Sequence, residues 1–308
     1  MGRQRQVDCC LLVPLYRPSL SRAEALSLVI SHGRGGLAAD LFLLHPPSLT
    51  PFVTQLRDWF LKHTPGSPCF QSLEFEEEHF SSLETYSALM LNPSLYERLS
   101  SYVWMLVVQT DALLLSDHWS DWLTCPLSYV GAPWFEGLHR PSQPLRLIGG
   151  GNGGVSLRRI ADCSAVLHRG GWLYPALRAL ERACLPRQRF RAEIRALRHW
   201  TFRAGSPNTI PVFEDLFWSF SAPVLQPQFL VASALQAARF AFETEPRHLW
   251  TLTGSLPVAC HAYERYDRNF WFTMFEQDHT LTSPFQGLAS SLYEACRRFP
   301  LAGVTCRP

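Results

Sequence analysis

A continuous apolar run that ends at an acid is the feature that most constrains how this chain can fold. Residues 103–108 are all apolar, which is typical of a strand covered on both faces of a sheet. Gln109, Thr110 and Asp111 follow directly, before a second apolar stretch. A carboxylate in such a setting is costly to desolvate unless a cation or hydrogen bonds compensate it. Because ligands of open α/β sheets bind at the carboxyl ends of strands, Asp111 is placed to meet a metal or polar ligand; the alternative is an acid that caps the next turn.

Strand-like and helix-like segments alternate over the first two hundred residues. Ser21-Arg-Ala-Glu24 has the form of a capping box that starts a helix. Strands are expected at 7–15, 41–44, 103–110 and 128–130, and helices at 22–30, 51–63, 81–91, 94–100, 158–168, 172–200, 232–240 and 287–297. This alternation predicts an α/β fold with a mainly parallel central sheet flanked by helices.

Composition excludes several classes of protein. The 308 residues are 47% hydrophobic, which is enough for a large core, and a net charge of +2 gives no reason to expect a nucleic-acid partner. Nine cysteines without a C-x-x-C pair indicate reduced thiols in a cytoplasmic protein rather than disulfides or a zinc site. No apolar run is long enough for a transmembrane helix, and residues 7–15 are interpreted as a first strand rather than a signal peptide. Peripheral membrane contact through surface Trp and Arg stays open.

Four polar clusters interrupt apolar context further along the chain. They are residues 109–111, the glycine-rich stretch 149–154, the acid pair Glu214-Asp215, and His261. Each has a structural alternative: the acid pair could only favour a helix N-terminus, and His261 could be a core histidine. The glycine stretch matches neither a dinucleotide fingerprint nor a P-loop, and no G-x-S-x-G elbow supports acyl-transfer hydrolysis.

The order of these motifs resembles a bacterial and fungal domain family of formally unknown function that is itself similar to GT-A glycosyltransferases. The resemblance covers most of the chain and is carried by Val13-Pro-Leu-Tyr16, Glu84-Thr-Tyr86, Tyr96-Glu-Arg98, Gln109-Thr-Asp111, Tyr129-Val-Gly-Ala-Pro-Trp134, Gly151-Asn-Gly-Gly154 with Ser156-Leu-Arg158, and Glu214-Asp215. It implies a single GT-A-like, Rossmann-like domain over residues 1–308. The Arg-rich segment 172–203 would be a helical insertion that serves acceptor specificity, membrane contact or a partner.

The resemblance also implies roles for individual residues. The nucleotide-sugar donor would be held by Pro14, Tyr16, Gln109, Thr110 and Asp111. A divalent metal, Mn²⁺ or Mg²⁺, would bind Asp111 and His261, although Gln109 stands where one of the usual carboxylates is expected, and a lone carboxylate makes a weaker site.

On the acceptor side, the resemblance implies that Asp215 takes the proton from the acceptor hydroxyl, with Glu214 as the alternative base. The wall between donor sugar and acceptor would be formed by Gly151, Asn152, Gly153 and Gly154. Trp134 would offer a flat face to a sugar ring.

The resulting hypothesis is an inverting glycosyltransferase that uses a nucleotide sugar and acts on a glycan, lipid-linked or protein acceptor in polysaccharide or glycoconjugate synthesis. Two alternatives remain from the sequence. One is a non-catalytic nucleotide- or glycan-binding module on the same scaffold, and the other is a transferase of a phosphosugar group. Donor, acceptor and oligomeric state are not determined by the sequence.

Overall fold

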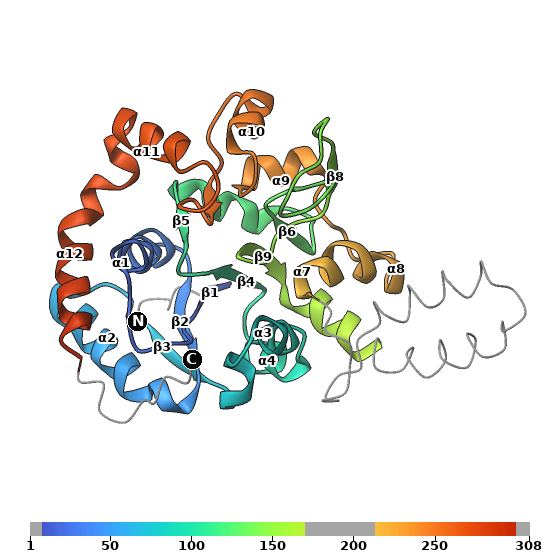
Figure 1. Ribbon diagram of the computed structural model, residues 1–308. Coiled ribbons are helices and arrows are strands. Elements are labelled where there is room, and N and C mark those ends of the chain that lie inside the picture. Colours follow the sequence, from blue (N-terminus) through green and yellow to red (C-terminus); the bar gives the residue numbers. More distant parts are fainter. Residues whose placement is uncertain (1–7, 170–212, 300–308) are drawn as a thin grey trace, which may run out of the picture.

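A central sheet organises the computed structural model, which describes residues 8–169 and 213–299 (Figure 1). The sheet has six strands in the order β3-β2-β1-β4-β9-β6. Their bounds are β1 (Cys9–Pro14), β2 (Asp40–His45), β3 (Gln71–Glu74), β4 (Trp104–Val108), β6 (Tyr129–Gly131) and β9 (Val155–Arg159). β1 pairs in parallel with β2 and β4, and β2 with β3, whereas β9 runs antiparallel to β4 and β6. The predicted α/β class is confirmed.

The alternation of side chains along β1 separates two apolar cores. Leu11 belongs to the core on one face of the sheet and Leu12 to the core on the other, because successive strand residues point to opposite faces. All residues of β1 and β4 are buried, as expected for central strands covered on both sides.

Helices cover both faces of this sheet (Figure 1). The first core contains residues of α1, α2 and α12, and the second contains residues of α3, α4 and the helix at 160–169. The helix bounds are α1 (Arg22–Ile30), α2 (Thr50–His63), α3 (Leu83–Met90), α4 (Pro93–Arg98), α7 (Glu214–Leu216), α8 (Ala222–Leu225), α9 (Ala234–Phe240), α10 (Pro246–Thr253), α11 (Arg268–Gln277) and α12 (Ser283–Arg297). Shorter 3₁₀ or π turns are η1 (Ser31–Gly35), η2 (Pro47–Leu49), η3 (Glu77–Phe80), η4 (Asp117–Thr124), η5 (Phe217–Ser221) and η6 (His279–Leu281).

Two smaller sheets border the carboxyl edge of the central sheet. The first has the order β10-β11-β5, with β5 (Ala112–Leu114), β10 (Ala241–Phe242) and β11 (Ala259–His261). β11 pairs antiparallel with β5 so that His261 lies opposite Ala112, which brings the end of β11 next to Asp111. The second is a hairpin of β7 (Trp134–Phe135) and β8 (Leu147–Gly149).

The capping box predicted at Ser21 is present. The Ser21 hydroxyl accepts from the Glu24 backbone N–H at 3.1 Å, and the Glu24 carboxylate accepts from the Ser21 N–H at 2.7 Å, which satisfies donors that a helix start leaves free.

The predicted start of one helix lies in a strand. The helix expected at 158–168 begins at residue 160, because Arg158 and Arg159 complete strand β9. This strand was missed because an arginine in a strand suggests solvent, yet Arg158 is fully buried. The helix predicted at 172–200 and the insertion at 172–203 lie outside the described residues. Within the described ranges, no helix has the length and apolar character needed to cross a membrane.

Candidate active site at the carboxyl edge of the sheet

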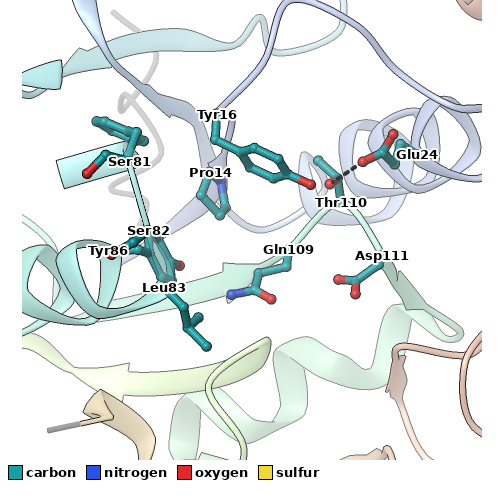
Figure 2. A pocket seen from close by; sticks show the side chains of 11 residues that line it. Pro14, Tyr16, Glu24, Ser81, Ser82, Leu83, Tyr86, Gln109, Thr110 and Asp111 are labelled. Atoms are coloured by element: carbon teal, nitrogen blue, oxygen red, sulfur yellow. Dashed lines mark hydrogen bonds between the residues drawn. The ribbon is translucent and has the colours of Figure 1, made fainter. Parts of the chain in front are cut away.

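A cavity of about 380 Å³ opens where β1 and β4 end (Figure 2). Pro14 is the last residue of β1, and Gln109 follows β4 directly. The lining residues are Pro14, Tyr16, Glu24, Phe80, Ser81, Ser82, Leu83, Tyr86, Gln109, Thr110 and Asp111. A volume in the range of small-molecule sites, with aromatic walls and a few polar groups, suits a ligand with flat and polar parts. The five residues predicted for the donor, from Pro14 to Asp111, all line this cavity.

Glu24 joins the cavity to the start of α1. Its carboxylate accepts from the Thr110 hydroxyl at 3.1 Å, as drawn in Figure 2, and pairs with Arg17 at 2.6 Å. These contacts fix the side chain of Thr110 beside Asp111. Glu24 was not predicted as a site residue, because its place in the capping box already accounts for a glutamate at this position.

His261 lies between two carboxylates. Its Nε2 is 3.2 Å from Asp111 Oδ1 and 3.2 Å from Gln109 Oε1, and its Nδ1 is 3.1 Å from Glu243 Oε1. Asp111 and His261, the two predicted metal ligands, are therefore in direct contact. Glu243 was not singled out in the sequence, where it occupies an unremarkable Glu-Thr-Glu stretch.

The charges of this cluster depend on one another. Burial disfavours the imidazolium, but hydrogen bonds to Asp111 and Glu243 outweigh it and raise the pKa of His261 to about 10. Burial likewise opposes ionisation of Asp111, but the bond to His261 lowers the pKa of that carboxyl. Without a ligand or metal, the cluster is thus a protonated histidine held by two carboxylates.

The glycine stretch passes directly over this histidine. A Cβ atom at Gly154 would overlap the His261 ring, so only glycine allows this approach. Asn152 fixes the turn, since its Oδ1 accepts from the Gly154 N–H at 2.7 Å and its Nδ2 donates to Glu243 at 3.1 Å. Asn152 therefore connects the loop to the partner of His261.

The two acids at the start of α7 have different surroundings. Glu214 is only 4% exposed and pairs with the buried guanidinium of Arg158 at 2.9 Å, while Asp215 is partly exposed. Burial and the neighbouring charge of Glu214 raise the pKa of Asp215 to about 7, against the lowering effect of the Leu216 N–H. A Cβ at Gly153 would overlap Glu214 and approach the Asp215 side chain, so the loop and the acid pair are in contact.

Trp134 does not present an open face. Its side chain is 4% exposed and packs against His139, with ring centroids 5.5 Å apart. Gly149 lies opposite it on β8. The expected stacking of Trp134 on a sugar stays a prediction, and it would require this cover to move.

The described residues contain no group of three or more His, Cys, Asp or Glu side chains placed to hold a metal ion. Gln109, the third side chain next to Asp111 and His261 on the Nε2 side of the ring, is an amide and not one of these types. The arrangement nevertheless brings together, at one edge of the sheet, a cavity, a charged cluster at its end and a partly exposed carboxylate across a glycine loop.

Comparison with known proteins identifies the family. A family model described as a protein of unknown function (DUF5672) matches residues 70–261, which is more than half of the chain. The chain belongs to this family. The match includes most of the site, from Phe80 to His261, and strand β4, whereas β1 and the lining residues Pro14, Tyr16 and Glu24 lie before it. No curated protein matches the chain significantly by sequence.

Three glycosyltransferases are among the solved structures that this chain is similar to. The galactosyltransferase LgtC, solved with donor and acceptor sugar analogues, aligns with a TM-score of 0.51 at 11% identity over 92% of this DUF5672 chain and 95% of LgtC. A glycosyltransferase involved in glycosylation of the major capsid of PBCV-1 aligns with a TM-score of 0.38 at 12% identity, over 82% of this chain and 92% of its own. GlyE of Streptococcus pneumoniae TIGR4 aligns with a TM-score of 0.45 at 11% identity, over 92% of this chain and 64% of its own. At this identity the likeness to LgtC concerns the fold, and the predicted GT-A-like fold is confirmed.

Proposed function

We propose that this DUF5672 chain is a glycosyltransferase that moves a sugar from a nucleotide-sugar donor to a hydroxyl of a glycan or glycoconjugate, with inversion at the sugar carbon. One observation carries the proposal: the cavity at the ends of β1 and β4, the cluster around His261 and the Asp215 carboxylate are joined through the loop 149–154. These are a pocket for the donor, a place for its diphosphate and a base for the acceptor.

The cavity suits a nucleoside. Tyr16, Phe80 and Tyr86 supply aromatic surface, while Ser81, Ser82 and Thr110 supply hydroxyl groups among its lining residues. Flat walls with a few polar groups are typical of sites that bind a base and a sugar. The diphosphate would then lie toward Asp111, at the end of the cavity nearest His261.

The residues at that end fit a divalent cation. Asp111 Oδ1 and Gln109 Oε1 are each 3.2 Å from His261 Nε2, which is close to the spacing of about 3 Å between neighbouring ligands of an octahedral ion bound at about 2.1 Å. Glu243 would be the outer partner that orients the imidazole. A metal there would neutralise charge on the departing diphosphate. His261 must give up its Nε2 proton to bind it.

Asp215 is the better candidate for the base. Glu214 is held by Arg158, whereas Asp215 is partly exposed and titrates near neutral pH. The Asp215 carboxylate would take the proton of the acceptor hydroxyl. The acceptor oxygen forms a bond to the sugar carbon as the bond from that carbon to the diphosphate oxygen breaks, and the electron pair leaves with the diphosphate.

A panel of nucleotide sugars tests the proposal. Purified protein is incubated with UDP-, GDP-, CMP- and dTDP-sugars, with and without Mn²⁺, and binding is measured by thermal shift while release of the nucleotide is measured by chromatography. We expect one class to bind and to be slowly hydrolysed. With an acceptor found, NMR of the product at the anomeric carbon distinguishes inversion from retention.

The same experiment addresses the non-catalytic alternative. This alternative is favoured by one observation: the described ranges contain no cluster of three His, Cys, Asp or Glu side chains placed to hold a metal ion. Binding without any turnover, unchanged in Asp215→Asn, would identify a binding module instead. Product mass would reveal transfer of a phosphosugar.

Asp111→Asn should remove the effect of the metal. We expect Mn²⁺ to raise the melting temperature of the parent protein in the presence of UDP or GDP. The apparent affinity for Mn²⁺ should fall at least about tenfold in Asp111→Asn, because even a residue that only orients a metal ligand contributes about 10–100-fold to metal affinity. Asp117→Asn is the matched control, because Asp117 is exposed and pairs with Arg34 at 3.5 Å, away from the cavity. Equal Mn²⁺ responses in Asp111→Asn and the parent would contradict the assignment.

The rate should fall as the pH drops below about 7. A base must be unprotonated, and the pKa of Asp215 is raised to about 7. We therefore expect kcat to rise through this region and level off above about pH 8, as measured with saturating donor from pH 5.5 to 9. A rate that stays flat down to pH 5 would exclude Asp215 as the base.

A further inference from the structure

Arg158 lies in β9, the strand that directly follows the glycine loop, and its side chain has no exposed surface. All three nitrogen atoms of its guanidinium have polar partners. Nη2 lies 3.0 Å from Glu214 Oε1 and 2.9 Å from Oε2, Nη1 donates to the Tyr96 hydroxyl at 3.3 Å, and Nε donates to the Ser156 hydroxyl at 3.0 Å. The Tyr96 hydroxyl in turn donates to the Met90 carbonyl at 2.8 Å.

Through Ser156 the guanidinium reaches the loop. The Ser156 hydroxyl, which accepts from Arg158, donates to the carbonyl of Gly153 at 3.2 Å. Gly153 is the residue whose missing side chain leaves room for Glu214. One planar group is therefore linked to the loop through Ser156 and binds Glu214 of the acid pair directly.

Through Glu214 the guanidinium reaches α7, which is 56 residues away in the sequence. Glu214 and Asp215 are consecutive in the first turn of this helix, so fixing one limits where the other can point. A fully buried ion pair is weak evidence for stability, because hydrophobic residues of similar volume often serve as well. Its place between loop and acid suggests a role in geometry.

We propose that Arg158 is a positioning residue: by binding Glu214 and, through Ser156, the loop at Gly153, it holds the Asp215 carboxylate at a fixed place beside the acceptor wall. This inference rests on the proposed function for its chemical meaning. The positioning itself concerns only the described residues and can be tested without any substrate.

The pair also sets the electrostatics of Asp215. Arg158 cannot lose its proton, and its positive charge opposes the effect of burial on the pKa of Glu214. The resulting Glu214 charge is, after burial, the next cause of the raised pKa of Asp215. Replacing both partners by neutral residues should thus lower the pKa of Asp215, and it avoids leaving one buried charge unpaired.

The substrate-free test is a stability cycle. Melting temperatures of the parent and of Asp215→Asn are compared from pH 4 to 9, and the comparison is repeated in the Arg158→Met/Glu214→Gln background. In the parent background the difference should grow from about pH 4, the ordinary pKa of the carboxyl, and level off above about pH 7, its pKa in the folded protein. In the double-variant background the levelling-off should move to lower pH by about one unit. An unchanged position of the levelling-off would overturn the inference.

Arg159→Met is the matched control in the cycle. Arg159 is the next residue, donates to the backbone carbonyls of Cys125 and Leu127 and stacks on Trp104, and none of these contacts involves the acid pair. Its loss should leave the levelling-off of the Asp215 pH dependence near pH 7. A shift as large as that of the double variant would show a general effect of packing and overturn the inference as well.

The second test uses activity and Arg158→Lys. Lysine keeps the charge but has a single nitrogen, so it cannot contact Glu214, the Tyr96 hydroxyl and the Ser156 hydroxyl from the three positions that Nη2, Nη1 and Nε occupy. We expect kcat to fall about 10–100-fold with the donor KM within twofold, because the base is displaced and the donor cavity is not. Arg159→Lys should keep its kcat. An unchanged kcat in a folded Arg158→Lys would overturn the inference. A parent protein with no activity on any donor would instead count against the proposed function, and the stability cycle would then decide whether Arg158 positions Asp215.

Discussion

Asp215→Asn is expected to lower kcat by about 10²–10⁴-fold while leaving the donor KM nearly unchanged. The amide has the shape of the carboxylate, and its oxygen can still accept from the Leu216 N–H, a bond of 2.8 Å in the parent. It cannot take a proton from the acceptor. The measurement is initial rate against donor concentration, with the acceptor saturating.

The same variant should not lose stability. The folded-state pKa of Asp215 is raised to about 7, above its ordinary value near 4, so the ionised carboxylate disfavours the folded state above pH 7, and this cost shrinks as the pH falls below 7 and is gone near pH 4. We therefore expect Asp215→Asn to melt at the same or a higher temperature than the parent at pH 8, and at about the same temperature near pH 4. Low activity with a lowered melting temperature at pH 8 would indicate misfolding rather than the loss of a base.

Asp162→Asn provides a comparison at a carboxylate outside the site. Asp162 accepts from the Ser128 hydroxyl at 2.6 Å and, like Asp215, is partly exposed. Its replacement should leave kcat within about twofold of the parent. A loss of rate as large as that of Asp215→Asn would show that the assay reports on folding.

Gly154→Ala is expected to have the largest effect on folding. The added methyl group would overlap the ring of His261, which is buried and held by Asp111 and Glu243 on opposite sides. The ring cannot move without breaking these contacts, so we expect a loss of about 1–3 kcal/mol or more in the free energy of unfolding. Denaturant unfolding monitored by tryptophan fluorescence measures it, and loss of the Mn²⁺ response should accompany it.

Gly287→Ala is the matched glycine control. Gly287 lies within α12, a Cβ there would meet open space, and its backbone has no positive φ. Alanine should therefore stabilise the protein by about 0.4–1 kcal/mol, because it has the higher helix propensity and restricts the unfolded chain. If Gly154→Ala were as stable as this control, the close packing of the loop on His261 would be contradicted.

Local patterns in the sequence were sufficient for the frame of the site. The apolar run before Asp111 became β4, Ser21 and Glu24 formed their capping box, and Glu214-Asp215 began a helix. Each of these depends on neighbours within a few residues, where periodicity and capping chemistry act. The run also placed Asp111 at the carboxyl edge, because a buried strand must end where polar residues begin.

The selection of partners was decided by the tertiary structure. Gln109 and His261 meet although 152 residues separate them, and Arg158 meets Glu214 across 56 residues. No local pattern encodes such contacts. They also bear on individual predictions, because the pairing of Glu214 with Arg158 supports the preference for Asp215 as the proposed base, and Trp134 is covered.

The sequence by itself therefore determined which polar residues interrupt the apolar framework and at which strand or helix ends they stand. Only the tertiary structure decided which of them form ion pairs or shift the pKa of one another, since a buried carboxylate takes its protonation state from the groups packed around it. Asp111 is held by His261, Glu214 by Arg158, and Asp215 carries a pKa near neutral pH as a result of burial and of the charge beside it.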